Sequence, residues 1–307
     1  MSATAIDLFA GLGGWSFGAE AAGLDVIWAA NHWKTATEFY ELNHGLKPVC
    51  QDLREANWSL VPGHDVLLAS PCCQGHSRAR GKENGNPEHD ESRSTAWAVV
   101  DAAEFHKPKI AIIENVVDFM KWSLYPAWAH AMNILGYSLS PHVVDCASLE
   151  VPQNRERLFI VCTRSKNPID IKLPEFAHSP ASSFIDFESG NWSLLDKPGR
   201  AAATLSRAAA GRDAHGDRFL MPYYKSGSGL TGRSLSRPIG TITTRARWAL
   251  VVGDRMRMLT VDETMQAMTF PKDTQRPKQN HVAIHLAGNA VPPKAAQHVI
   301  EAVLRAA

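Results

Sequence analysis

The sequence lacks the features that mark secreted, membrane and zinc-binding proteins. Its five cysteines are odd in number and form no C-x-x-C pair, which argues against both a disulfide framework and a zinc site. No stretch approaches the roughly 18 consecutive apolar residues of a membrane span, and the N-terminus has no charged-then-apolar secretory signal. We therefore expect a cytoplasmic protein that binds neither a metal nor a membrane.

The chain also lacks a net charge large enough to indicate a nucleic-acid partner by itself. The formal net charge of its 307 residues is +1, with 32 Lys and Arg against 31 Asp and Glu. The charges are unevenly distributed, because the segment from Arg200 to Arg247 holds nine Lys or Arg and two acids. We expect this segment to form one basic face that binds a phosphate backbone.

Strand and helix patterns alternate up to about residue 165, which predicts an open α/β domain. From residue 166 the chain is rich in Pro, Gly, Ser and Arg, with short extended runs, and predicts a smaller, irregular, β-rich domain. Helix patterns return over Arg255–Met268 and again from Pro293, where we expect the last helix to pack against the first domain. The predicted domains are therefore 1–165 with 280–307, and 166–279.

The central feature of the first domain is a buried strand that ends at two adjacent cysteines. Val66–Ala69 is an unbroken apolar run, and it stops at Ser70 and Pro71, where the proline ring removes a backbone donor. Cys72 and Cys73 follow, and then a long polar segment. A lone cysteine is more often a small buried side chain. A thiol at the carboxyl end of a core strand, however, lies where an open α/β sheet holds its reacting groups.

The other strand ends of this domain carry glycines or polar side chains. The first strand runs into Gly11, Gly13 and Gly14, where a helix begins, and glycines at such a turn let a ligand approach the backbone. Ser16 stands where the dinucleotide fingerprint G-x-G-x-x-G needs its third glycine, so a nicotinamide cofactor is disfavoured. The polar residues at the other strand ends are Asn31 with His32, Gln51 with Asp52, and Glu114 with Asn115.

Two arginines precede a later apolar run. Arg155 and Arg157 alternate, so an extended backbone points both side chains to the same side. Beside a carboxylate such as Glu114 and a thiol, they would form a clamp for an anion or for the edge of a base. An exposed pair of arginines is the alternative interpretation.

Six short motifs follow one another in the order found in the DNA cytosine-5 methyltransferase family, and the chain resembles that family over most of its length. The motifs are Asp7–Gly14, Pro71–Ser77, Glu114–Val116, Gln153–Arg157, Arg237–Thr243 and Gly288–Val291. Each is weak alone, whereas six in order, each on its expected element, form a strong signal. The resemblance implies an α/β fold with a Rossmann-like S-adenosylmethionine-dependent methyltransferase sheet, helices on both of its faces, and a target-recognition domain.

The resemblance also implies a reaction and the residues that perform it. The protein would transfer a methyl group from S-adenosylmethionine to C5 of a cytosine flipped out of double-stranded DNA, through a covalent bond between Cys73 and C6. Glu114 would hydrogen-bond N3 and the amine, and Arg157, with Arg155 beside it, would hold O2. The expected cofactor-binding residues are Phe9, Gly11, Gly13, Gly14, Asn31, His32, Asp52 and Asn289.

Three positions depart from the family pattern. Cys72 stands where the family has proline, which leaves it as an alternative to Cys73; His76 replaces a common phenylalanine, and His32 replaces an acid that binds the ribose. The alternatives to a DNA methyltransferase are the same chemistry on RNA such as tRNA, a catalytically silent module that binds the cofactor or DNA, and, least favoured, a nicotinamide oxidoreductase. By resemblance we expect a monomeric enzyme of bacterial or phage type, of the kind found in restriction–modification.

Overall fold

The computed structural model describes residues 2–72, 95–223 and 231–307. The chain divides into two compact units, each with its own sheet. No helix of the described residues is long and apolar enough to cross a membrane. Within the same residues, no three or more His, Cys, Asp or Glu side chains are grouped so that they could hold a metal ion.

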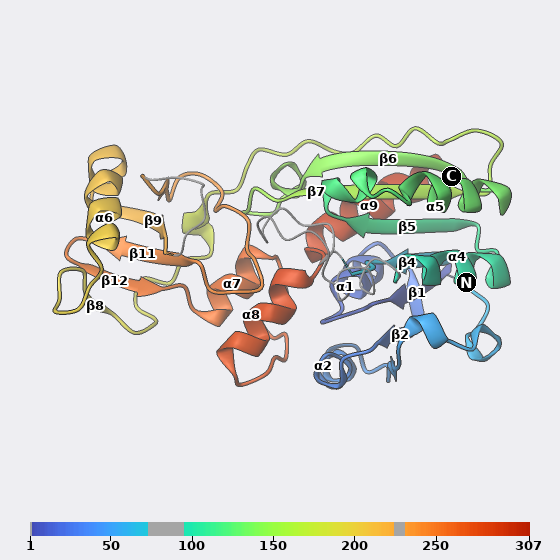
Figure 1. Cartoon of the computed structure of the whole chain (residues 1–307), viewed down its shortest axis with the longest axis horizontal. Helices are drawn as coiled ribbons and strands as arrows, with labels where there is room; N and C mark the ends of the chain where they lie inside the picture. The colour runs from blue at the N-terminus through green and yellow to red at the C-terminus, as the bar shows by residue number, and fades with distance from the viewer. Residues whose placement is uncertain (1, 73–94, 224–230) are drawn as a thin grey trace. The chain divides into compact units, whose positions relative to one another are not determined.

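The first unit is built on a seven-stranded sheet (Figure 1) and consists of Met1–Leu149, Glu156–Glu175 and Ala290–Ala307. The strand order is β3-β2-β1-β4-β5-β7-β6. Strands β1 to β5 pair in parallel, and β7 is antiparallel to both β5 and β6. The strands are β1 (Thr4–Leu8), β2 (Asp25–Asn31), β3 (Val49–Cys50), β4 (Val66–Ala69), β5 (Ile110–Asn115), β6 (Ser138–Asp145) and β7 (Glu156–Thr163).

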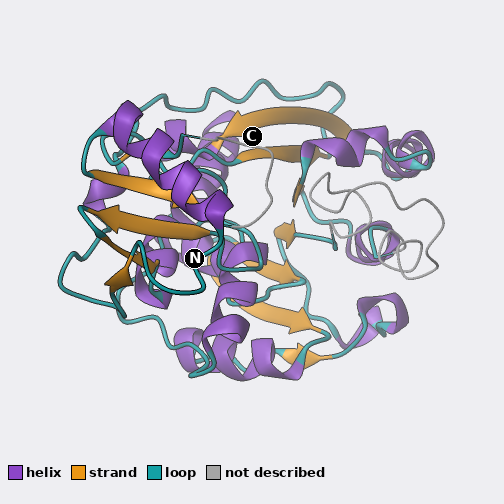
Figure 2. Cartoon of the chain, turned by 60° about the vertical axis from the view of Figure 1, so that its left-hand side comes forward, coloured by secondary structure: helices purple, strands orange, loops and turns teal. Residues whose placement is uncertain are grey.

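Helices cover both faces of this sheet, as the sequence predicted. They are α1 (Gly14–Ala21), α2 (Lys34–His44), α4 (Trp97–His106), α5 (Tyr125–Ile134) and α9 (Pro293–Ala306), drawn in purple in Figure 2. Leu158, Ile160 and Cys162 of β7 join the cluster formed with α4 and α5. Phe159, which alternates with them, meets Trp15 of α1 on the other face, where α1 packs against α9.

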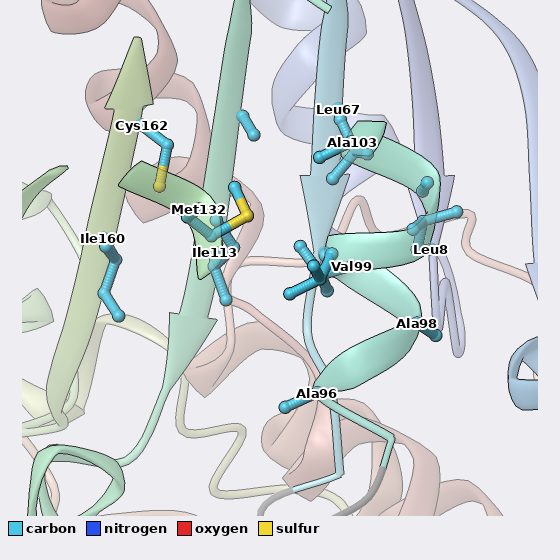
Figure 3. Close-up of a cluster of buried hydrophobic side chains, with 14 of the residues drawn as sticks. Leu8, Leu67, Ala96, Ala98, Val99, Ala103, Ile113, Met132, Ile160 and Cys162 are labelled. Carbon is cyan, nitrogen blue, oxygen red and sulfur yellow. The ribbon is translucent and has the colours of Figure 1, made fainter. Parts of the chain in front are cut away.

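The larger core of the first unit lies on the α4 and α5 face. Figure 3 shows Leu8 of β1, Leu67 of β4 and Ile113 of β5 among its side chains. Val99 of α4 and Met132 of α5 belong to the same cluster, and all five residues are fully buried. Because close-packed side chains from neighbouring strands allow little movement, this cluster holds the ends of β1, β4 and β5 in fixed relative positions.

The carboxyl ends of the parallel strands meet at one edge of the sheet. The chain begins at β1, extends the sheet outward to β3 and then crosses to β4, so the order of connection reverses between β1 and β4. In open α/β sheets, ligands bind at such a switch point, outside the carboxyl ends of the strands. Because β7 is antiparallel, its first residues, Glu156 and Arg157, lie at this same edge beside the end of β5.

The second unit consists of Glu150–Arg155 and Phe176–Asn289 and contains a five-stranded antiparallel sheet in the order β10-β9-β11-β12-β8. Helix α6 packs so closely against β9 that a Cβ at Gly211 would overlap the ring of Phe219. The strands are β8 (Ser193–Leu194), β9 (Arg218–Pro222), β10 (Arg233–Ser234), β11 (Trp248–Val252) and β12 (Arg255–Met258). The helices are α6 (Ala202–His215), α7 (Val261–Ala267) and α8 (Asn280–Asn289).

Two predictions of secondary structure in the second unit are wrong. Arg255–Met268 was predicted as one helix, but its first four residues form β12, which pairs with β11. The side chain of Thr260 then caps α7 by accepting a hydrogen bond from the N–H of Glu263. The 14-residue helix α6 also lies where the sequence predicted short extended runs.

The division into units differs from the predicted one in three short segments. Residues 150–155 and 280–289 belong to the second unit, and residues 166–175 belong to the first. The contacts of Arg155 show why, because its guanidinium donates to the backbone carbonyls of Ile242 and Gly288. The C-terminal helix α9 packs against α1 and belongs to the first unit.

Candidate active site

A turn with left-handed backbone joins β1 to α1. Phe9 has a φ of 64°, and Gly11 and Gly13 have φ values of 57° and 87°. Bulky residues rarely adopt this conformation, so Phe9 carries local backbone strain of the kind found at ligand sites. A Cβ at Gly13 would overlap the ring of His44, whereas beyond Gly11 the nearest atom is the Phe9 carbonyl oxygen at 3.9 Å. The inner side of the turn therefore requires glycine, and its outer side is open at Gly11.

The motif near the C-terminus packs against this turn. A Cβ at Gly14 would overlap the carbonyl oxygen of Val291. One helical turn further along α1, a Cβ at Gly18 would overlap Ala296 of α9. The close approach of these two backbones explains why positions 14 and 18 of α1 are glycine.

A buried hydrogen-bonded network lies beneath the turn. Ser16 donates to Oδ2 of Asp7 at 2.7 Å, and the hydroxyls of Ser16 and Tyr40 share a second hydrogen bond of 2.7 Å. All three side chains are fully buried, and burial raises the pKa of Asp7 from its ordinary value of 3.8 to about 7. Ser16, the residue that departs from the dinucleotide fingerprint, therefore supports the turn through this buried hydrogen-bonded network.

The polar residues that follow β2 and β3 lie at the same edge of the sheet. Asn31 is 9% exposed, and its side-chain oxygen accepts a hydrogen bond from the N–H of Trp33 at 2.9 Å. His32 is exposed. The carboxylate of Asp52 accepts hydrogen bonds from the backbone N–H and the guanidinium of Arg54, which hold its pKa below the ordinary value.

These residues fit the cofactor that the family resemblance implies. The turn is open at Gly11, and the first N–H groups of the helix that follows lie at its end, as in other sites for nucleotide ligands. Asn31, His32 and Asp52 supply polar groups at the adjacent strand ends, where such folds hold a ribose. Asn289, the remaining predicted cofactor residue, is exposed at the end of α8 in the second unit. The cofactor assignments stay predictions.

Side chains from other elements hold the chain where β4 ends. The side-chain amide of Asn115 donates to the Pro71 carbonyl at 3.1 Å. The backbone N–H of Cys72 donates to the Thr95 hydroxyl at 3.1 Å. Cys73, the predicted nucleophile, lies outside the described residues, so the structure describes only the residues that lead to it.

The predicted acid and one predicted arginine form an ion pair. Oε1 of Glu114, at the end of β5, is 3.1 Å from Nε of Arg157, at the start of β7. The two side chains are 8% and 14% exposed, and Nη1 of Arg157 donates to the carbonyl of Glu156 at 2.7 Å. Charges so far removed from water depend on each other as partners. The antiparallel pairing of β5 with β7 therefore brings the acid and the arginine together.

Arg155 has different partners. Its side chain is 1% exposed, with Nη1 donating to the Ile242 carbonyl at 3.0 Å and Nη2 to the Gly288 carbonyl at 2.9 Å. Arg155 precedes β7 and belongs to the second unit, so its partners differ from those of Arg157, and the expected clamp of the two arginines stays a prediction. A catalytic role for Arg155 stays a prediction, whereas these contacts are those of a structural side chain.

Several basic residues of the second unit make hydrogen bonds within that unit, and the predicted basic face stays a prediction. Of the nine between Arg200 and Arg247, four donate to backbone carbonyls of the same unit: Arg200, Arg207, Arg212 and Arg233. Arg237 and Arg245 are exposed, and Lys225 lies outside the described residues. Part of the positive charge therefore supports the fold of this unit.

Several residues that hold the site carried little signal in the sequence. Trp15, Arg54 and Thr95 gave none, since their partners follow from tertiary contacts or from a local turn. Asn115 belongs to the motif Glu114–Val116, and its position directly after Glu114 was the signal in the sequence that it lies at the site.

The chain matches one protein family over almost its whole length. The family is the C-5 cytosine-specific DNA methylases, and the match covers residues 3–305. The type II methyltransferase M.HhaI of Haemophilus parahaemolyticus is 35% identical over 176 residues, which are 56% of this chain and 51%, about half, of that protein. The type II methyltransferase M.NlaX of Neisseria lactamica is 26% identical over 308 residues, which are 93% of this chain and 91% of that protein.

A solved structure shares the fold. The S. pombe Dnmt2 methyltransferase has a TM-score of 0.67 at 16% identity, with 99% of each chain covered. At this identity the likeness concerns the fold alone. Because the family match extends from the first strand to the last helix, this chain belongs to the C-5 cytosine-specific DNA methylase family.

Proposed function

We propose that this chain transfers the methyl group of S-adenosylmethionine to C5 of a cytosine in duplex DNA. The observation that supports this most directly is the ion pair of Glu114 with Arg157 at the carboxyl edge of the sheet. The residue next to Glu114, Asn115, hydrogen-bonds Pro71, two residues before Cys73. Residues from three separate motifs are thus adjacent at one edge, as a reaction on a pyrimidine ring requires.

The pyrimidine ring has to be activated before C5 can react. S-adenosylmethionine supplies an electrophilic methyl group, but C5 of cytosine is too weakly nucleophilic to attack it. Cys73, as a thiolate, adds to C6 and makes C5 the nucleophilic carbon of an enamine. Once C5 carries the methyl group, a base, for which water suffices, removes the C5 proton, and Cys73 leaves.

Glu114 and Arg157 stabilise the ring while it carries this charge. Glu114 hydrogen-bonds N3 and the exocyclic amine and supplies a proton as the ring accepts electrons. Arg157 holds O2, where negative charge develops. Both side chains are nearly buried and paired with each other. A bound cytosine therefore has to replace part of the interaction of their ion pair with its own hydrogen bonds.

The target cytosine has to leave the double helix, because none of these groups can reach it inside a base pair. Flipping the base out costs a few kcal/mol, which contacts between the second unit and the DNA backbone offset. Arg237 and Arg245 are exposed candidates for these contacts. Both relatives described above are type II methyltransferases of bacteria, which supports a role in restriction–modification. A monomeric enzyme in a bacterial or phage-infected cytoplasm stays part of the proposal.

Duplex DNA that contains 5-fluorocytosine tests the reaction and the nucleophile together. Fluorine cannot leave as a cation, so an active enzyme incubated with S-adenosylmethionine should be trapped on the DNA. We expect the adduct, measured as a covalent protein–DNA band, with the wild type and with Cys72→Ser, and none with Cys73→Ser. An adduct kept by Cys73→Ser and lost by Cys72→Ser would assign the nucleophile to Cys72.

The same assay on fluorinated tRNA tests the substrate. An adduct on tRNA and none on duplex DNA would contradict the DNA substrate while leaving the chemistry intact. No adduct on either, with S-adenosylmethionine still bound, would favour a silent binding module. Glu114→Gln is a matched control, because it keeps the size of the side chain and should slow adduct formation while Cys73 is intact.

A further inference from the structure

We propose that a hydrogen bond from Trp15 to Ser70 positions the nucleophile segment against the glycine turn. The nucleophile segment is Ser70–Cys72, which leads to Cys73, and the glycine turn is residues 9–14. Trp15 and Ser70 both lie outside the six family motifs recognised in the sequence. The proposal rests on the methyltransferase function above and assigns the two residues a positioning role in it.

Trp15 is held in one orientation. It is the second residue of α1, directly after the glycine turn, and is 2% exposed. Its ring meets the ring of Phe159 of β7 edge-on, with centroids 5.9 Å apart and planes at 83°. The indole Nε1 donates to the Ser70 hydroxyl at 2.9 Å. A buried ring packed in this way has little freedom to turn, so its N–H is directed at one acceptor.

The nucleophile segment has an anchor at each of its residues. The N–H of Ser70 donates to the carbonyl of Leu8 in β1 at 3.3 Å, and its hydroxyl accepts from Trp15. The Pro71 carbonyl and the Cys72 N–H have the side-chain partners described above. Among these anchors, the hydrogen bond from Trp15 comes from α1, the helix that follows the glycine turn.

This hydrogen bond joins the parts of the site that would hold the two reacting groups. The glycine turn would hold the cofactor, and the thiol of Cys73 follows Ser70 by three residues. Methyl transfer requires reacting atoms about 3–3.5 Å apart. Small movements of the nucleophile segment against the turn should therefore slow the chemical step while leaving cofactor affinity unchanged.

Two single substitutions and their combination test the contact. Trp15→Phe removes the donor and keeps a ring against Phe159, and Ser70→Ala removes the acceptor. Each should lower the single-turnover methylation rate about five- to tenfold, with the dissociation constant for S-adenosylhomocysteine close to that of the wild type. The double variant should be no slower than either single variant, because both remove the same bond. Ser70→Thr keeps the hydroxyl and should retain the wild-type rate.

Tyr137→Phe is a matched control in the same unit. The buried Tyr137 hydroxyl donates to the Pro108 carbonyl at 2.7 Å, at the opposite edge of the sheet. This variant also loses one hydrogen bond of a buried aromatic side chain. Its melting temperature should fall about as much as that of Trp15→Phe, whereas its methylation rate should stay at the wild-type value.

Three results would overturn the positioning role. They are unchanged rates in both single variants, rate losses that multiply in the double variant, and an equal rate loss in Tyr137→Phe, which would make the effect one of general stability.

A wild type that methylates neither DNA nor tRNA would contradict the proposed function instead. Alkylation of Cys73 by iodoacetamide, measured by mass spectrometry, then tests the contact. S-adenosylhomocysteine should change the alkylation rate in the wild type and leave it unchanged in Trp15→Phe. An equal response in the two proteins, or none in the wild type, would overturn the inference.

Discussion

One buried carboxyl group links a cofactor motif to the stability of the protein. Asp7 belongs to the first motif, where the sequence indicated only a ligand turn. Its Oδ2 accepts from Ser16, and its Oδ1 has no hydrogen-bond partner within the described part of the chain. Burial therefore dominates and raises the pKa of Asp7 to about 7.

Asp7→Asn should become more stable relative to the wild type as the pH rises from about 4 to 8. Between pH 3.8 and about 7 the Asp7 carboxyl of the folded wild type keeps its proton, whereas that of the unfolded chain loses it. The stability that the protonated Asp7 contributes is therefore fully present below pH 3.8 and is lost as the pH rises through about 7. The shift of about three pH units corresponds to at most about 4 kcal/mol. Urea unfolding of both proteins at pH 4 and pH 8 measures the change.

Asp65→Asn is the control with the opposite sign. Hydrogen bonds from Thr4 and Lys109 hold the pKa of the Asp65 carboxyl below its ordinary value. Its contribution to stability is present above that ordinary value and is lost as the pH falls, so this substitution should cost more at pH 7 than at pH 3. A difference between Asp7→Asn and the wild type that does not vary with pH would contradict the raised pKa of Asp7.

At the scale of elements, the packing of α1 against α9 depends on a glycine. The ideal Cβ of Gly18 would overlap Ala296 and would lie close to backbone atoms of Pro293 and Gln297. Helix α9 buries most of one side, including Val299, so a movement of α9 away from α1 would disturb this packing. The two helices can therefore approach only with their backbones nearly in contact.

Gly18→Ala should destabilise the protein, although alanine favours helices. The overlap with α9 should cost about 1–3 kcal/mol, which exceeds the gain of about 1 kcal/mol in helix propensity. Gly63→Ala is the control, because Gly63 is exposed and nothing lies within 4 Å of its ideal Cβ. Urea unfolding measures both variants, and a Gly18→Ala stability at or above that of the wild type would show that α9 can shift.

The elements of the first unit were predictable because their side chains repeat at one period. The strand predicted over Val66–Ala69 is β4, and the helix predicted from Pro293 is α9. Helix α6 was missed because few of its residues are buried, so it lacks an apolar stripe. Arg255–Met258 alternates with period two, and the helix pattern that follows it obscured this strand signal.

At the scale of the whole molecule, two arginines that are neighbours in the sequence belong to different units. Arg157 should be required for the reaction and Arg155 for the stability of the second unit. Arg157→Lys keeps the charge but loses the guanidinium, and should lower the single-turnover methylation rate about a hundredfold. Arg155→Lys should leave a buried carbonyl without its donor and cost about 1–3 kcal/mol of stability.

The two substitutions act as controls for each other, because each replaces the same side chain by lysine. Methylation kinetics and thermal unfolding of both variants separate the roles. Loss of the methylation rate in Arg155→Lys at an unchanged melting temperature would support the catalytic role that the sequence motif predicted. A lower melting temperature with normal kinetics in Arg157→Lys would contradict the role of the ion pair with Glu114.

The sequence by itself determined the family and indicated the polar residues at the ends of the parallel strands, and it predicted the reacting groups. These depend on short motifs and on local periodicity, both of which can be read along the chain. Only the tertiary structure decided which side chains meet: Trp15 with Ser70 at a separation of 55 residues, and Arg155 with Gly288 at a separation of 133. The physical reason is that a long polar side chain can satisfy its donors with many acceptors, and packing between distant segments selects among them.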